Sequence, residues 1–177
     1  MERIDIPFDR FTVSPVKAWE TDWLLLAAGD FAAADWNCMT VGWGAFGRMW
    51  SRPMALVVVR PTRHTHGFTE RFDTFTLSAF PAGCRSALDY CGSHSGRDGE
   101  KAKAAGISPV AARLVQAPAF AEAELVVECR KMYVDPLEPR HFLADWIEAS
   151  YPKKDYSTMY FGEIVAVSGT SKYLAAT

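Results

Sequence analysis

Six short apolar or alternating runs constrain the fold of this 177-residue chain more than any other feature. They cover residues 23–28, 38–43, 55–59, 75–80, 124–134 and 159–169. Each run has residue types typical of a β-strand, and turns or short helical patterns separate most of them. The chain also lacks the G-x-x-x-x-G-K-[ST] pattern of a phosphate-binding loop. We therefore predict a mainly β fold, with one antiparallel barrel rather than a doubly wound parallel sheet.

Four segments between or after these runs have helical patterns. The predicted helices are residues 65–72 with Thr65 as N-cap, residues 84–91 ended by Gly92, a short helix from Asp98 to Gly106, and an amphipathic helix that begins near Pro139. The chain shows no repeat, no low-complexity segment and no linker. We expect a single domain over residues 1–177.

Composition and charge exclude several classes of function. The net charge is -2, which argues against a nucleic-acid-binding protein. The N-terminus has no apolar signal segment and no apolar run approaches the length of a membrane span, so neither secretion nor a membrane location is expected. The four cysteines, at positions 38, 84, 91 and 129, form no C-x-x-C pair. We interpret them as reduced thiols in a cytoplasmic protein.

The loop from Ser93 to Lys101 has the parts of a phosphate site. Ser93 and Ser95 offer hydroxyl groups, and Gly96 lets the backbone approach an anion closely. Arg97 and Lys101 add two positive charges. A solvated polar loop is the alternative interpretation of this segment.

A second cationic segment follows the predicted strand at 55–59. Five arginines and one acidic residue lie between Arg48 and Arg71, which favours a small anionic ligand over a polyanion. Arg60 and Arg63 are three residues apart, and His64 and Thr65 follow them. These arginines could hold the same phosphate, or they could be ordinary surface residues at a strand end.

The segment from Asn37 to Trp43 combines an amide, a hydroxyl and a flat aromatic ring. A flavin ring needs hydrogen-bond partners along its pyrimidine edge and apolar contact on one face. Cys38, Met39 and Thr40 complete this segment, although Met and Trp side chains are more often part of a core.

Three motifs occur together and in order: Asn37-x-Met39-Thr40-x-x-Trp43-Gly44, Arg60-Pro61-x-Arg63-His64-Thr65, and Ser95-Gly96-Arg97-Asp98-x-x-Lys101. Together they resemble the flavin reductase-like, FMN-binding split-barrel family, in particular its flavoredoxin-type branch. The resemblance continues through Glu128-Cys129-Arg130-Lys131-x-Tyr133, Asp155-Tyr156 and Gly162-Glu163-Ile164. It therefore covers nearly the whole chain.

This resemblance implies an antiparallel Greek-key split β-barrel that forms a homodimer, with FMN near the subunit interface. It implies that Asn37, Met39, Thr40 and Trp43 contact the flavin ring or ribityl chain. Arg60, Arg63, Thr65, Ser95, Gly96 and Lys101 would surround the ribityl phosphate. The candidate FMN-binding residues are then Asn37, Cys38, Met39, Thr40, Trp43, Arg60, Arg63, His64, Thr65, Ser93, Ser95, Gly96, Arg97 and Lys101.

The function implied is an oxidoreductase that passes electrons from NAD(P)H or a redox partner through bound FMN to an acceptor. No catalytic side chain is required, because the chemistry takes place on the flavin. An electron carrier without its own NAD(P)H turnover is one alternative, and a non-enzymatic protein that binds flavin or another anion is a second. The chain departs from the family pattern at Ser157, where a histidine is expected after Asp-Tyr, and at His64, where tyrosine is common.

Two further chemistries have little support in the sequence. His64 and His66 could bind a metal, but no third ligand lies at a recognisable spacing, so no metal site is predicted. Ser95 is not part of a G-x-S-x-G motif, which argues against a nucleophilic hydrolase.

Overall fold

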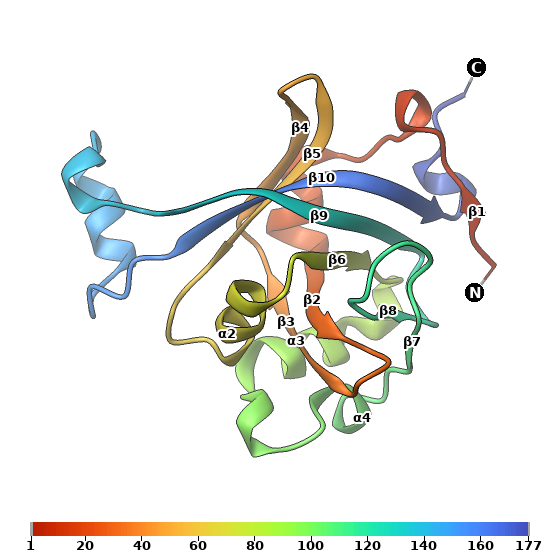
Figure 1. Cartoon of the computed structure of the whole chain (residues 1–177), viewed down its shortest axis with the longest axis horizontal. Coiled ribbons are helices and arrows are strands. Elements are labelled where there is room, and N and C mark those ends of the chain that lie inside the picture. Colours follow the sequence, from red (N-terminus) through yellow and green to blue (C-terminus); the bar gives the residue numbers. More distant parts are fainter. Residues whose placement is uncertain (1, 177) are drawn as a thin grey trace.

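The computed structural model describes residues 2–176 and contains one large antiparallel sheet (Figure 1). The strand order is β3-β2-β6-β9-β10-β5-β4, and β1 pairs with β10 beside this path. These strands are β1 (Ile4–Asp5), β2 (Leu24–Asp30), β3 (Asp35–Val41), β4 (Gly44–Met49), β5 (Arg52–Val59), β6 (Thr74–Ala79), β9 (Leu125–Pro136) and β10 (Thr158–Gly169). A small pair, β7 (Pro109–Val110) and β8 (Ala119–Phe120), lies outside this sheet.

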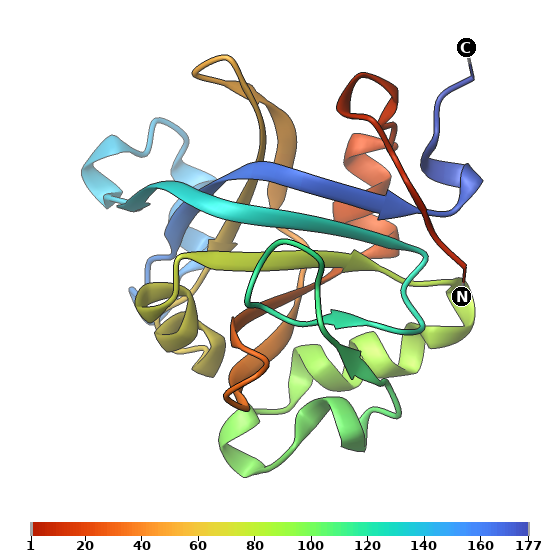
Figure 2. The ribbon, with the colours of Figure 1, turned by 45° about the vertical axis from the view of Figure 1, so that its right-hand side comes forward.

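The four α-helical segments are α1 (Pro15–Lys17), α2 (His64–Arg71), α3 (Arg85–Ser93) and α4 (Lys101–Ala104). Helices α3 and α4 lie together against one face of the sheet, as Figure 2 shows in light green. No helix within residues 2–176 is both long and apolar enough to cross a membrane.

Strand β2 explains how the sheet acquires two apolar faces. Leu24 and Leu26 belong to one buried cluster, and Leu25 between them belongs to the other, because successive side chains of a strand point to opposite faces. The first cluster includes Phe75 and Val127, and the second lies under α3 and α4. A continuous apolar run is therefore needed in β2, as in any strand covered on both sides.

The long strands β9 and β10 bend the sheet. Their pairing shifts register between Phe161 and Gly162 and again between Ile164 and Ala166. A β-carbon at Gly162 would lie 2.6 Å from the Phe75 ring, so glycine permits the close approach of β10 to β6 at this bend. All six predicted strands are present, although their bounds differ by a few residues at several ends.

Strand β4 was missed by the sequence analysis, which predicted no strand between residues 43 and 55. Glycines are poor strand formers, so they gave no strand signal here. Gly44 is nevertheless required, because a β-carbon at this position would lie 2.3 Å from the oxygen of Leu56. The segment also has the spacing G-x-G-x-x-G, yet it leads into a strand and not a helix, so it lacks the context of a dinucleotide-binding turn. Trp50 and Ser51, with φ of 49° and 61°, turn β4 back into β5.

Two predicted N-caps are wrong. Helix α2 begins at His64, one residue earlier than predicted, and the Thr65 hydroxyl instead accepts a hydrogen bond from Asn37. Helix α4 begins at Lys101, and Asp98 ends a separate 3₁₀ turn, η4 (Gly96–Asp98), which Ser95 caps by accepting from the Arg97 amide at 3.2 Å. At Thr65 the tertiary contact with Asn37 overrides the local preference for an N-cap. At Asp98 the intervening 3₁₀ turn does so.

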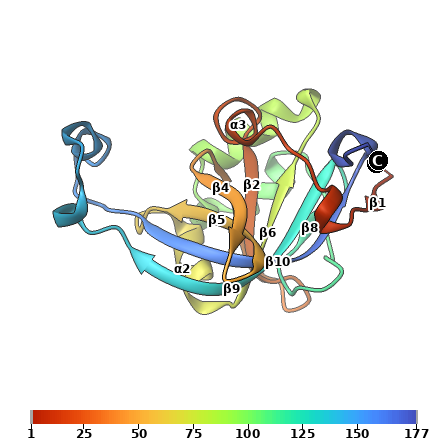
Figure 3. The same cartoon turned by 90° about the horizontal axis from the view of Figure 1, so that it is seen from above.

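The amphipathic helix predicted after Pro139 is also wrong. The segment contains two 3₁₀ turns, η5 (Pro139–His141) and η6 (Asp145–Ser150), and it projects away from the sheet (Figure 3). Leu143 is 98% exposed and Trp146 is 74% exposed. A short helix depends on burial of its apolar side, and here Leu143 and Trp146 of that side stay exposed while Phe142 stacks on Tyr151.

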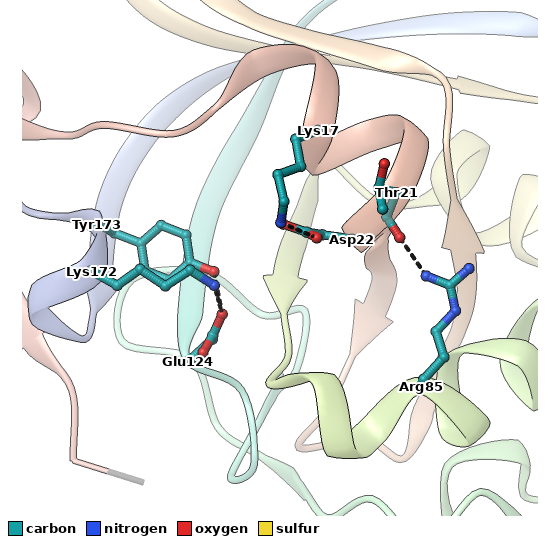
Figure 4. A network of polar contacts seen from close by, with 7 residues as sticks. All are labelled: Lys17, Thr21, Asp22, Arg85, Glu124, Lys172 and Tyr173. Atoms are coloured by element: carbon teal, nitrogen blue, oxygen red, sulfur yellow. Dashed lines mark hydrogen bonds and ion pairs between the residues drawn. The ribbon is translucent and has the colours of Figure 1, made fainter.

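Polar contacts tie the C-terminal segment to the start of β9 and the segment before β2 to α3 (Figure 4). Glu124, just before β9, accepts a 2.6 Å hydrogen bond from Tyr173 and pairs with Lys172. Arg85 of α3 donates to the Thr21 oxygen and stacks over the Trp23 ring at 3.3 Å. These contacts hold the segment before β2 against α3.

Candidate functional site

A cleft of about 250 Å³ lies where β3, β5, α3 and β10 meet. Met39, Thr40 and Trp43 line it from β3 and the link to β4, and Arg60 and Arg63 line it from the segment after β5. Its remaining walls are Val41, Gly42, Val58, Gly92 and Ser157. The structure therefore brings together the flat aromatic segment and the arginine pair, which are separate in the sequence.

Arg60 closes one side of this cleft. Its guanidinium lies 4.8 Å from the ring centre of Tyr151 and 5.6 Å from that of Trp43. It also pairs with Asp155 at 3.2 Å and donates to the Ser150 oxygen at 2.6 Å. Part of the Arg60 charge is thus already balanced, so Arg60 is less available to a phosphate than the sequence pattern indicated.

Arg63 and Lys101 both bind the C-terminal end of α3. Arg63 donates to the oxygen of Gly92 at 2.5 Å, and Lys101 donates to that of Cys91 at 3.2 Å. Lys101 also donates to the Cys38 oxygen of β3 at 2.8 Å. The last carbonyl groups of a helix carry partial negative charge, which favours cations at this end. An ammonium group has three N–H donors, so Lys101 retains one for a ligand.

The two cations are buried enough for their pKa values to shift. Burial lowers the pKa of Arg63, and the neighbouring charge of Arg60 lowers it further. Burial also lowers the pKa of Lys101, and Arg63 adds to this effect, while the thiols of Cys38 and Cys91 oppose it. Both shifts indicate positive charge that has been removed from water and lies close to other positive charge.

The pKa of His64 is also shifted by nearby positive charges. Its pKa is lowered by burial first and then by Arg97, Lys101 and Arg71. Cations from α2, η4 and α4 therefore face one region beside the end of α3. Arg63, the N-cap of α2, acts on Lys101 in the same way, and we call Arg63, Lys101 and the exposed Arg97 the cation cluster.

Asn37, Thr65 and Gly96 connect the cation cluster to β3. The Asn37 amide donates to the Thr65 hydroxyl at 2.9 Å, and both residues are buried. A β-carbon at Gly96 would lie 2.2 Å from the Asn37 side-chain oxygen. Only glycine allows η4 to lie this close to β3. The three residues come from the three separate motifs, and the structure brings them into direct contact.

A second cavity of about 850 Å³ lies beside this contact. Asn37, Cys38, His64, Gly96 and Lys101 contribute to its walls, together with residues of α2 and of the segment 99–109. Candidate residues thus line two spaces, one bordered by the Trp43 ring, the other larger and bordered by a buried ammonium group.

Ser93 and Ser95 line neither of these two cavities. The Ser93 hydroxyl donates to the Asp89 oxygen at 2.8 Å, and the Ser95 oxygen accepts the Arg97 amide. Thr40 lines the smaller cleft, but its hydroxyl donates to the Leu88 oxygen at 2.5 Å. Local hydrogen bonds to the backbone therefore already engage these three hydroxyl groups.

Sequence reasoning missed Tyr151 and Gly92 as parts of the site. Tyr151 is 2% exposed, stacks on Arg60 and donates to the Ser157 hydroxyl at 3.2 Å. Ser157, which replaces the histidine expected from the family, is therefore part of the cleft wall. The nearby Asp155-Tyr156 motif was the available signal, because it placed this segment in the family pattern.

Three solved structures have the same fold as this chain. An FMN-binding domain of a flavin reductase-like enzyme from Shewanella baltica OS155 aligns with a TM-score of 0.69 and 14% identity, covering 97% of this chain and 78% of the other. Flavoredoxin from Methanosarcina acetivorans aligns with a TM-score of 0.66 and 24% identity, covering 98% and 78%. An NADH:FAD oxidoreductase from Streptomyces globisporus aligns with a TM-score of 0.64 and 18% identity, covering 86% and 77%.

These alignments confirm the predicted split-barrel fold. No curated protein sequence matches the chain significantly. The sequence profile of the family described as flavin reductase like domain matches residues 11–174, which span all three motifs and both cavities. The chain therefore belongs to the flavin reductase-like family.

Proposed function

We propose that this protein binds FMN and is an oxidoreductase that passes electrons from NAD(P)H or a redox partner through the flavin to an acceptor. The observation that carries this proposal is the cation cluster next to a flat aromatic cleft. FMN carries a phosphate and a planar ring at the two ends of its ribityl chain, and the site offers a complementary surface for each end.

The cation cluster supports phosphate binding. Lys101 has one N–H unused by its two carbonyl partners, and the Arg63 guanidinium uses one donor on Gly92 out of the five it carries. Desolvated cations close to one another are stabilised by an added anion. Gly96 supports the same role, since its lack of a side chain holds η4 beside the cluster.

The aromatic cleft supports ring binding. β3 lies at one edge of the sheet, so its outer backbone groups are free of strand pairing, and those not bound by Lys101 can hydrogen-bond a pyrimidine edge. Trp43 is 47% exposed beside this edge and offers a flat apolar surface. Bound FMN would supply the electron transfer, while Met39, Thr40 and Trp43 orient the ring and shield it from water. Tyr151 and Arg60 would border its far side.

We also propose that the protein is a homodimer. The segment between β9 and β10 projects from the sheet with Leu143 and Trp146 exposed, and apolar surface of this kind favours contact with a second subunit. Sedimentation at several protein concentrations tests this proposal. A monomer at all concentrations would contradict it.

The decisive experiment is the visible absorption spectrum of the purified protein, before and after addition of FMN and desalting. A retained flavin spectrum that bleaches on anaerobic addition of NADH or NADPH is the expected result. Retained flavin that bleaches only with a redox protein would favour the electron-carrier alternative. If no flavin is retained, a protein that binds a different anion becomes the better description.

A further inference from the structure

Two of the four cysteines form a buried pair. Cys38 in β3 is 1% exposed and Cys91 in α3 is 0% exposed, and both belong to the apolar cluster under α3. Each thiol shifts the pKa of the other, so the two side chains face each other between β3 and α3. Both cysteines are free, so the pair is in its reduced form.

Lys101 fixes the backbone on both sides of this pair. Its ammonium nitrogen donates to the Cys38 oxygen at 2.8 Å and to the Cys91 oxygen at 3.2 Å, so one side chain holds β3 and α3 together at the two cysteines. The ammonium group also places a positive charge beside the sulfur atoms. A neighbouring cation stabilises a thiolate, which is the reactive form of cysteine.

The two thiols are not equivalent. The pKa of Cys91 is lowered, mainly by the hydrogen bond from Cys38 and also by Lys101, although burial opposes this. The pKa of Cys38 is raised, first by the same hydrogen bond and then by burial. A lowered thiol pKa favours the thiolate, which is the form that attacks an oxidised sulfur.

Cys38 also borders the 850 Å³ cavity, together with Lys101. A small oxidant that enters this cavity therefore lies next to Cys38, while both side chains of the pair are buried. The other two cysteines have different surroundings. Burial and then Glu128 raise the pKa of Cys129, and burial with Glu122 and Glu124 raises that of Cys84.

We propose that Cys38 and Cys91 form a reversible intramolecular disulfide when the protein meets hydrogen peroxide. Peroxide first oxidises one thiol to a sulfenic acid and releases one water. The second thiol then attacks that sulfur, a second water leaves, and the S–S bond forms. Overall, two thiols lose two protons and two electrons, and one peroxide is reduced to two waters. A dithiol reductant reverses the reaction by thiol–disulfide exchange.

The test uses the full-length Cys84→Ser variant, because Cys84 is the most exposed cysteine and would otherwise react separately. Thiols are counted in denaturant after a short treatment with equimolar peroxide. The expected count falls from three to one and returns to three after dithiothreitol. Peptide mapping should then find one cross-linked species that joins the Cys38 and Cys91 peptides.

A second variant, Cys84→Ser with Cys91→Ser, is the matched control. Its peroxide product should be a sulfenic acid that arsenite reduces, with no cross-linked peptide. The mapping of the Cys84→Ser protein does not depend on this control, so poor folding of the double variant leaves the test intact. Cys38 and Cys91 that both remain alkylatable after peroxide, or a disulfide that involves Cys129, would overturn the proposal.

Discussion

Lys101 donates a hydrogen bond from its buried ammonium group to the main-chain oxygen of Cys38 at 2.8 Å. This bond crosses from α4 to the edge strand β3, and it supplies a partner for a carbonyl group that no neighbouring strand could reach. The same side chain belongs to the cation cluster. Structure and proposed ligand binding therefore depend on one lysine, and its replacement should affect both.

We expect Lys101→Met to weaken FMN binding by about ten- to a hundredfold, because a charge-assisted hydrogen bond is worth about 1.5–3 kcal/mol. The variant should also lose about 1–3 kcal/mol of stability, since two buried carbonyl groups lose their donor. Flavin fluorescence titration and urea unfolding measure the two effects separately. Lys17→Met is the control, because Lys17 is exposed and lines neither cavity. Equal FMN affinity of the two variants would remove Lys101 from the site.

Replacement of Arg63 should weaken binding without a large loss of stability. Arg63 contributes one hydrogen bond to Gly92 and a positive charge beside the cleft. We expect Arg63→Gln to lower FMN affinity by about tenfold or more and to flatten its salt dependence. Arg48→Gln, on the exposed end of β4, changes the net charge equally and should bind like the unmodified protein. If Arg63→Gln and Arg48→Gln lowered the FMN affinity equally, the affinity would depend only on the net charge of the protein.

A methyl group at Gly96 should separate η4 from β3. The added β-carbon would lie 2.2 Å from the Asn37 side-chain oxygen, so Asn37 must move away from Thr65. We expect Gly96→Ala to lower the free energy of unfolding by about 1–3 kcal/mol. Gly67→Ala in α2 meets no atom within 4 Å and should raise stability by about 0.4–1 kcal/mol. Urea unfolding compares the two, and an unchanged midpoint for Gly96→Ala would contradict the close contact.

The pKa of His64 should depend on the cation cluster. Burial and the charges of Arg97, Lys101 and Arg71 hold this pKa below its ordinary value. The folded protein therefore binds fewer protons than the unfolded chain as the pH falls through about 6.5, so His64 reduces stability in that range. Above this range His64 is neutral in both states and has no effect.

NMR titration of the His64 ring measures this pKa directly. Arg97→Gln should raise it toward the ordinary value, and bound FMN should raise it too, because an anion offsets the positive field. Arg48→Gln serves as the charge-matched control and should leave the pKa of His64 unchanged, since Arg48 is not among the charges that shift it. A pKa that does not respond to Arg97→Gln would place Arg97 outside the cluster.

Local patterns predicted most of the fold. The strands at 55–59, 75–80, 124–134 and 159–169 were found because alternation and apolar runs are properties of neighbouring residues. Strand β4 was missed because its glycines carry no such signal, and the helix after Pro139 was wrong because Leu143 and Trp146 of its apolar pattern stay exposed.

By itself, the sequence determined the antiparallel split barrel and the family, through short motifs that keep their order and spacing. Only the tertiary structure decided how the candidate residues are used. In the folded chain Arg60 pairs with Asp155, and the Ser93 hydroxyl donates to a backbone oxygen. Lys101 lies beside the two buried cysteines and donates to their main-chain oxygens. The physical reason is that each of these contacts needs two chain segments to meet at hydrogen-bond distance. That distance depends on how α3, α4 and the projecting segment pack against the sheet, which no local pattern specifies.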